Sequence, residues 1–333
     1  MNDDVRAIAD AVLYEGYVLW PYRRSALKNQ RRWTFGGVYP RAHSEGRDDD
    51  PWVMRTQCLV EAAGNDAVVS VGVRFLHVVR RDVARATDDG GLQAVDELTV
   101  AGERNLAWEE AVEREVAVDV PLRGPGRAVP IEVAAGREEE PLLGGDGVRA
   151  GAIVRAWEPL EGNVEATSEA LAPGLYRVTV TIANTTPWAG GPREAVLPST
   201  FCSTHTVLRA TGGAFVSLTD PPEALREAAA SCDNTGTWPV LVGEPGERDT
   251  LLSSPIILED HPQIAPESPG DLFDGGEIDQ MLVLNILSLT DEEKAEMRDS
   301  DPRTRAILER TEALSEAELA RLHGTIRDFQ VLR

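Results

Sequence analysis

The middle of the chain carries side chains that bind metal ions: Cys202, His205 and Cys232, with His261 further along. Thiolate and imidazole are ligands of zinc and nickel, and a metal site needs three or four of them. On a regular strand, however, Cys202 and His205 point to opposite faces because they are three residues apart. They can share one metal only across a bulge or a turn. A buried thiol and a hydrogen-bonded imidazole are the simpler interpretation, so we predict no cofactor other than zinc or nickel at this site.

The same stretch contains the residue types of a hydrolytic triad. Ser203 and His205 share a face on a strand, and a distant carboxylate such as Asp249 would orient the histidine. The chain has no Gly-x-Ser-x-Gly turn to expose a nucleophile. We therefore assign no catalytic residue, and a non-catalytic role is favoured while enzymatic activity stays open. His77 follows the same alternation as Phe75 and Val79, which indicates a core histidine.

Residues 22–33, YRRSALKNQRRW, combine positive charge with aromatic rings in a chain whose net charge is −23. Guanidinium groups bind phosphates and acidic protein surfaces, and neighbouring rings add cation–π contacts. We predict a rigid surface for a protein or small anionic partner, formed by Tyr22, Arg23, Arg24, Lys28, Asn29, Arg31, Arg32 and Trp33. The alternative is docking on the chain's own acidic stretch, residues 259–301. Nucleic acid would use similar chemistry, but the net charge disfavours it.

Composition places the chain among folded proteins, with 333 residues, 42% hydrophobic and 27% charged. No stretch has the roughly 18 uninterrupted apolar residues of a membrane span. The start, MNDD, lacks the basic and apolar regions of a signal peptide. Three widely spaced cysteines fit reduced thiols better than a disulfide framework. We therefore expect a cytoplasmic protein without a membrane span.

Alternating apolar residues predict strands over much of the chain after about residue 53. Two runs are clearest, and their apolar members are Val69, Val71, Val73, Phe75 and Val79 in one, and Tyr176, Val178, Val180 and Ile182 in the other. Such alternation is typical of strands with one buried face. Turn clusters separate many such runs, without long helices between them. The sequence therefore predicts a mainly β fold, an antiparallel β-sandwich or barrel-like core.

Helix signals gather towards the end of the chain and make the fold α+β overall. Asp220 with two prolines and Glu223 starts one helix, Thr290 with Glu293 forms a capping box, and Ser315 with Glu318 forms another. We predict four regions: an ordered basic and aromatic arm (1–50), the sandwich core (51–219), a helix plus a Pro/Gly-rich wrap packed on the core (220–275), and a tail of short helices (276–333).

Two blocks carry a family resemblance: LYEGYVLWPYRRSALKNQRRWTFGGVYP near the start, and GTWPVLVGEPGERDTLLSSPIILEDHPQIAPESPGDLFDGGEIDQ late in the chain. They resemble an uncharacterised family of proteins, mostly from actinobacteria, that is associated with gene clusters for nickel-iron hydrogenases. STHT at 203–206 and RLHG at 321–324 belong to the same resemblance. It implies no reaction and no catalytic residues.

The resemblance implies an accessory, assembly or structural protein of a nickel-iron hydrogenase system that acts by protein–protein contact. Two alternatives remain open at this point. One is a metal-dependent enzyme or metallochaperone that uses Cys202, His205 and Cys232. The other is a sandwich that binds a small anionic ligand.

Overall fold

The computed structural model describes residues 3–14, 35–47, 49–262, 286–300 and 302–314. The basic segment at residues 22–33 and the predicted capping box at Ser315 lie outside the described residues, as do residues 263–285 of the acidic stretch 259–301. The described helices are α1 (Asp3–Tyr14), α2 (Arg41–Ser44), α3 (Arg193–Val196), α4 (Arg226–Ala230), α6 (Asp291–Ser300), α7 (Pro302–Glu312) and the short η1 (Leu197–Ser199) and η2 (Glu223–Leu225).

Strands make up most of the fold, and they pair antiparallel throughout the described residues. They are β1 (Val53–Glu61), β2 (Val68–Ala86), β3 (Leu92–Val95), β4 (Glu97–Val100), β5 (Glu103–Leu106), β6 (Trp108–Pro121), β7 (Arg127–Val133), β8 (Gly136–Leu143), β9 (Arg149–Trp157), β10 (Leu160–Ala172), β11 (Leu175–Asn184), β12 (Cys202–Thr211), β13 (Ala214–Val216), β14 (Trp238–Leu241) and β15 (Thr250–Ser254).

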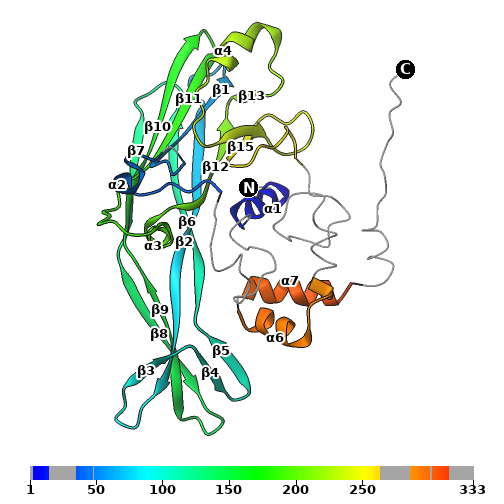
Figure 1. Ribbon diagram of the computed structural model, residues 1–333. Coiled ribbons are helices and arrows are strands. Elements are labelled where there is room, and N and C mark those ends of the chain that lie inside the picture. The colour runs from blue at the N-terminus through cyan, green and yellow to red at the C-terminus, as the bar shows by residue number, and fades with distance from the viewer. Residues whose placement is uncertain (1–2, 15–34, 48, 263–285, 301, 315–333) are drawn as a thin grey trace.

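Two sheets form the body of the molecule. One has five strands in the order β13-β1-β11-β10-β7, and the other has eight in the order β14-β15-β12-β2-β9-β8, with β3 and β6 also paired to β2. The small pair β4-β5 is separate. The two large sheets face each other over one core (Figure 1). The mainly β, α+β fold expected from the sequence is therefore confirmed.

The alternating residues of the sequence line this core. Val69, Val71, Val73 and Phe75 of β2 are buried against Tyr176, Val178, Val180 and Ile182 of β11. The rings of Phe75 and Phe201 stack with centroids 4.7 Å apart. Because side chains on a strand alternate, the intervening residues of β2 point to the outer face of the eight-stranded sheet.

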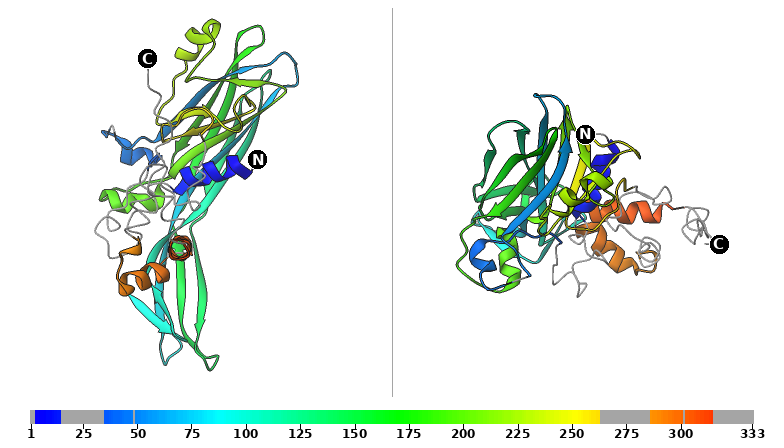
Figure 2. Two further views of the ribbon diagram at one scale, coloured as in Figure 1. Left: turned by 90° about the vertical axis from the view of Figure 1, so that its right-hand side faces the viewer. Right: turned by 90° about the horizontal axis from the view of Figure 1, so that it is seen from above.

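Strand β2 continues past the sandwich and forms the spine of a projecting arm (Figures 1 and 2). Its first part pairs with β12 and β6, and its last part, from Arg80 to Ala86, pairs with β9 and β3. We call β2 from Arg80 onward, with β3, β4, β5, β8 and β9, the distal arm. The apolar alternation seen in the sequence was followed only as far as Val79, whereas the strand continues to Ala86.

The distal arm has a small core of its own. Val83, Leu98 and Val100 are buried together, with Val95, Leu142 and Ala150 packed against them. The hairpins at the far end of the arm therefore pack together around a small hydrophobic core.

The segments after residue 220 show two features that the sequence predicted, a capping box and an ordered Pro/Gly-rich stretch. Thr290 and Glu293 form the capping box, with the Thr290 amide donating to Glu293 Oε2 at 2.9 Å and the Glu293 amide to Thr290 Oγ1 at 3.3 Å. Within the Pro/Gly-rich stretch, β14 and β15 join the eight-stranded sheet. None of the described helices combines the length and apolar character that crossing a membrane requires.

Candidate functional site

The outer face of the eight-stranded sheet carries most of the polar chemistry near the predicted site residues. Strand pairing sets Gly72 of β2 opposite Val207 of β12 on one side and opposite Ala117 of β6 on the other. Two residues further along β2, Arg74 lies opposite His205 of β12 and Glu115 of β6. One part of this face is covered by α1, and the next part is an open groove.

Helix α1 covers its part of the face through apolar contacts. Ile8, Ala9 and Val12 are buried against Val240, Val242 and Leu252, with Val207 packed against the same cluster. Their spacing in DDVRAIADAVLY is that of one helical face. The helix therefore docks on the sheet as an amphipathic element.

A buried arginine joins α1 to two strands. Arg74 Nη2 bonds Asp10 Oδ1 of α1 at 2.5 Å and Glu113 Oε1 of β6 at 2.6 Å, and its side chain is only 4% exposed. Arg74 Nε donates to the same Glu113 oxygen at 2.8 Å. Burial alone lowers the pKa of Arg74, but the hydrogen bonds to Asp10 and then Glu113 outweigh it and raise that pKa. The charge is thus compensated inside the protein.

His205 lies across from this arginine and is completely buried. Burial first, and the positive charge of Arg74 second, lower the pKa of His205 to about 3. Its Nδ1 lies 3.2 Å from the carbonyl oxygen of Ser203. Neutral imidazole can donate there from Nδ1, which makes Nε2 an acceptor, and Nε2 has no hydrogen-bond partner among the described residues. His205 is neutral at physiological pH.

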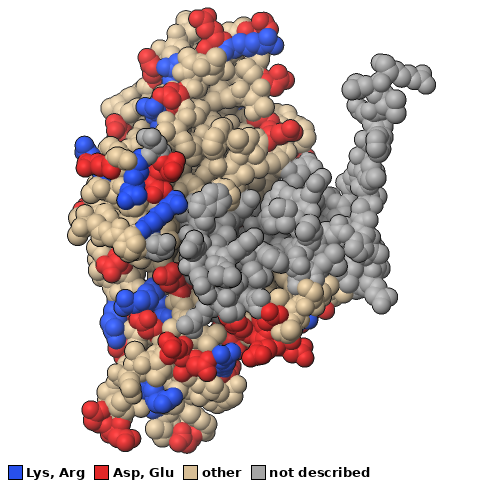
Figure 3. Space-filling model, viewed as in Figure 1, with Lys and Arg blue, Asp and Glu red and all other residues tan. Residues whose placement is uncertain are grey.

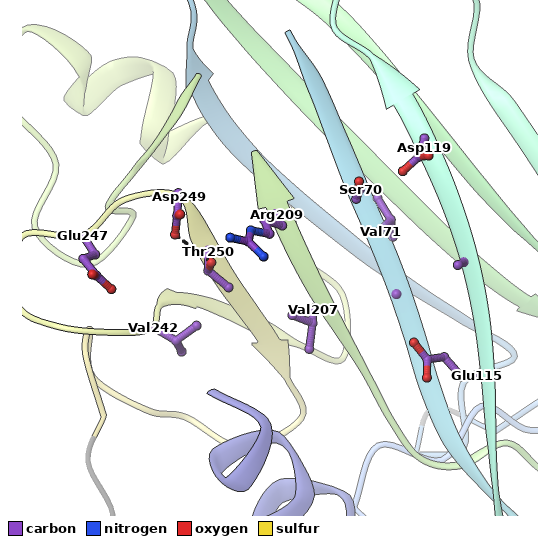
Figure 4. A pocket seen from close by; sticks show the side chains of 12 residues that line it. Ser70, Val71, Glu115, Asp119, Val207, Arg209, Val242, Glu247, Asp249 and Thr250 are labelled. Carbon is purple, nitrogen blue, oxygen red and sulfur yellow. Dashed lines mark hydrogen bonds between the residues drawn. The ribbon is translucent and has the colours of Figure 1, made fainter. Parts of the chain in front are cut away.

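Beyond α1, the outer face opens into a groove of about 420 Å³ (Figure 4). Glu247 and Asp249 line one side and Glu115 and Asp119 the other, with Arg209 between them. The floor of the groove is formed by backbone and short side chains, from Ser70, Gly72, Ala117 and Val207. The groove therefore has anionic walls over a low floor, which does not favour the anionic-ligand alternative raised by the sequence.

Gly72 is the unusual residue of this floor. Glycine inside a strand weakens it, and it often marks a bulge or a place where a ligand or another backbone approaches closely. The pairing of β2 with β12 and β6 is regular at Gly72. A Cβ there would meet only Glu115 Oε1 at 3.5 Å and the Val207 carbonyl oxygen at 3.9 Å, both ordinary contacts. The protein's own packing does not require a glycine at this position.

Of the three residues predicted to bind metal, the structure places Cys232 away from Cys202 and His205. Cys202 is buried in a cluster with Tyr39, Leu76 and Leu197, whereas Cys232 packs beside Leu59, Leu175 and Val216 on the other sheet. His261 Nδ1 lies 3.2 Å from the carbonyl oxygen of Gly243, in a loop next to β14. Within the described ranges, no three His, Cys, Asp or Glu side chains are grouped so that they could hold a metal ion. The metal site stays a prediction.

The residues that could have formed a hydrolytic triad, Ser203, His205 and Asp249, are not assembled into one. Ser203 Oγ is buried and makes no hydrogen bond to any residue that the structure describes. Asp249 is exposed and accepts a 2.8 Å hydrogen bond from Thr250. His77 is buried as expected, and burial and Arg114 lower its pKa to about 4.

The basic segment itself, from Tyr22 to Trp33, lies outside the described residues, but its flanks do not. Before it, α1 is docked on the sheet. After it, Val38 and Phe201 exchange backbone hydrogen bonds of 2.9 and 3.0 Å, and Asn184 Nδ2 donates to the Val38 carbonyl at 2.8 Å. His43 and Asp50, both buried, then form a 3.0 Å contact that fixes the following turn. Both flanks are thus attached to the sandwich.

Sequence reasoning missed the groove. Its carboxylates come from β6 and from the segment between β14 and β15, and nothing in one strand's pattern shows that they meet. The one available signal was Gly72, a glycine in the interior of the strand sequence VVSVGVRF.

No protein-family model matches this sequence, and no curated protein does so either.

Proposed function

We propose that this protein acts by protein–protein contact, as an accessory, assembly or structural protein without catalytic activity, and that its partner belongs to a nickel-iron hydrogenase system. The hydrogenase part of the proposal rests on the resemblance of the two sequence blocks described above. The contact part rests on one structural observation: a projecting distal arm that carries exposed apolar residues at its far end.

The distal arm is stiffened where it leaves the sandwich. Arg155 of β9 bonds Glu110 of β6 and Glu140 of β8, each at 2.7 Å. Glu110 in turn pairs with Arg81 of β2 at 3.2 Å. We call these four residues the neck ladder. Arg81 is buried and also donates to the Leu106 carbonyl at 2.6 Å, so alternating charges tie four strands together.

Exposed apolar side chains flank the turn between β8 and β9. Leu143 is 53% exposed and Val148 is 62% exposed. The turn between them is ordered, because the Gly144 amide donates to the Val148 carbonyl at 2.8 Å and the Val148 amide to Asp146 Oδ1 at 3.0 Å. Preorganised apolar groups lose little entropy when a partner covers them. Because more than half of each residue is exposed, Leu143 and Val148 contribute little to the stability of the isolated chain.

The edge of the arm is less suited to a partner than its tip. Strand β8 has the sequence GREEEPLL, with Pro141 and a run of acidic residues. Proline and charge on an edge strand oppose pairing with a strand of another chain. Figure 3 shows acidic side chains at the ends of the arm and over α6, so a partner surface there would have to be apolar with a basic rim.

The proposal is tested by co-purification from a host that makes the hydrogenase. The variant Leu143→Ser/Val148→Ser should recover far less hydrogenase than the wild type and keep the same melting temperature. The control is Ile257→Ser, because Ile257 is 73% exposed but lies after β15, away from the arm. Equal recovery of hydrogenase with all three proteins would exclude the arm as the contact, and recovery of none with the wild type would reject the proposed partner.

A further inference from the structure

The groove on the outer face is the uncovered continuation of a surface that already holds a packed segment. Val207 and Val242 belong both to the apolar cluster under α1 and to the lining of the groove. The same strands that receive α1 thus run on into the groove without a cover among the described residues. A second segment can lie there in the same way as α1.

Gly72 provides the clearance for such a segment. An alanine or valine would favour the strand more than glycine does, by up to about 1 kcal/mol. Because the pairing at Gly72 is regular and a Cβ would meet nothing closer than 3.5 Å, neither a bulge nor crowding explains the glycine. Close approach of another chain to the floor does explain it.

The walls fix the chemistry of that chain. Glu115 and Asp119 have no ion pair or hydrogen bond among the described side chains, and they face Glu247 and Asp249 across the floor. The Glu247 carboxylate accepts the Glu244 amide at 3.1 Å, and Arg209 is the cation between the walls. Carboxylates remain in excess, so the complementary occupant is cationic.

We infer that this groove docks a short basic segment of a partner protein, with a small residue against Gly72 and arginine or lysine side chains against the four wall carboxylates. The surface is distinct from the distal arm, so the inference holds or fails independently of the proposed function. A nucleic acid or an anionic lipid would meet repulsion from the same walls.

Binding is measured by fluorescence anisotropy of a short synthetic peptide of alternating arginine and alanine, at physiological salt. A peptide of alternating glutamate and alanine serves as the negative probe. The variant Gly72→Val fills the floor and should weaken binding of the arginine peptide at least about tenfold, while its melting temperature equals or exceeds that of the wild type. The control is Thr181→Val, which places a valine on the outer face of the other sheet, away from the groove.

A second pair of variants separates the groove from the general acidity of the protein. Glu115→Gln/Asp249→Asn removes two wall charges, and Glu132→Gln/Glu138→Gln removes two exposed charges elsewhere. Only the first should weaken binding. If both double variants lost the same amount of affinity for the arginine peptide, or if Gly72→Val bound it as tightly as the wild type, the peptide would be attracted by the overall acidity of the protein. Either result would overturn the inference. The inference would also be overturned if spermine displaced the arginine peptide from Gly72→Val as effectively as from the wild type.

Discussion

Cys202 and His205 lie on the same face of β12, although they are three residues apart. Across the strand pair, Cys202 is opposite Leu76 and His205 is opposite Arg74, with a shift of register between them. Since Leu76 and Arg74 are alternate residues of β2, their partners share one side. The bulge that a shared site would require is therefore present, and Ser203 within it has a φ of 51°.

This bulge predicts an unusual response to substitution at Ser203. A non-glycine residue at positive φ costs about 1 kcal/mol, and a buried hydroxyl without a partner costs about as much again. Ser203→Gly relieves both costs, whereas Ser203→Ala relieves only the second. We expect both variants to raise the free energy of unfolding, measured in urea. For Ser203→Gly the net gain is about 1 kcal/mol, because glycine also increases the entropy of the unfolded chain and this offsets part of the relief. A loss of stability in both would mean that the hydroxyl has a partner.

The two buried histidines predict a loss of stability in acid. The pKa is lowered from 6.5 to about 3 for His205 and to about 4 for His77. Between these values and 6.5 the unfolded chain binds more protons than the folded one, so stability is complete above about pH 6.5 and falls as the pH drops towards 3. Each histidine should contribute roughly 1.4 kcal/mol per pH unit in this window.

Urea unfolding of the wild type and of His205→Gln at several pH values between 7 and 5 measures this contribution. The variant should show the shallower dependence on pH, whatever its stability at pH 7. Identical slopes for the two proteins would mean that His205 is not the group that takes up the proton.

The sequence predicted the strands of the sandwich because one side of each strand is buried and the other is not. Tyr176 to Ile182 shows this alternation directly. It could not predict the bulge at Ser203, because that bulge arises where β12 is paired to β2 on one side while Thr204 donates its amide to the Gly36 carbonyl at 3.0 Å. Such a feature depends on residues far apart in the chain.

The distal arm was missed for a similar reason. Arg81 and Arg155 look like solvent-facing charges when each strand is read alone. In the structure they lie opposite each other on β2 and β9, and Glu110 of a third strand compensates both. Charge pairing between strands is invisible to a pattern within one strand, as is the meeting of the groove carboxylates.

The neck ladder predicts a local effect on the distal arm. Arg155→Met removes two ion pairs from a side chain that is 30% exposed. Opening of β8 and β9 should become easier by about 1 to 2 kcal/mol, which speeds their amide hydrogen exchange about 5- to 30-fold and leaves β10 and β11 unchanged. The control Arg137→Met breaks a 3.2 Å pair in which Arg137 is 58% exposed, and should change little. A uniform increase over the whole chain would show that arm and sandwich unfold together.

The ion pair between Asp10 and Arg74 predicts that α1 can be loosened without disturbing the sheet beneath it. In Asp10→Asn, the Arg74 guanidinium keeps its bonds of 2.6 and 2.8 Å to Glu113, so no unpaired charge is left buried. Amide exchange of α1 should therefore rise about 5- to 30-fold, as expected for a loss of 1 to 2 kcal/mol, while β2 and β12 keep their protection.

Arg6→Gln on the exposed side of the helix is the control and should leave α1 as protected as in the wild type. Unchanged exchange of α1 in Asp10→Asn would mean that Ile8, Ala9 and Val12 hold the helix alone, and faster exchange in β2 would mean that Glu113 is not a sufficient partner for Arg74.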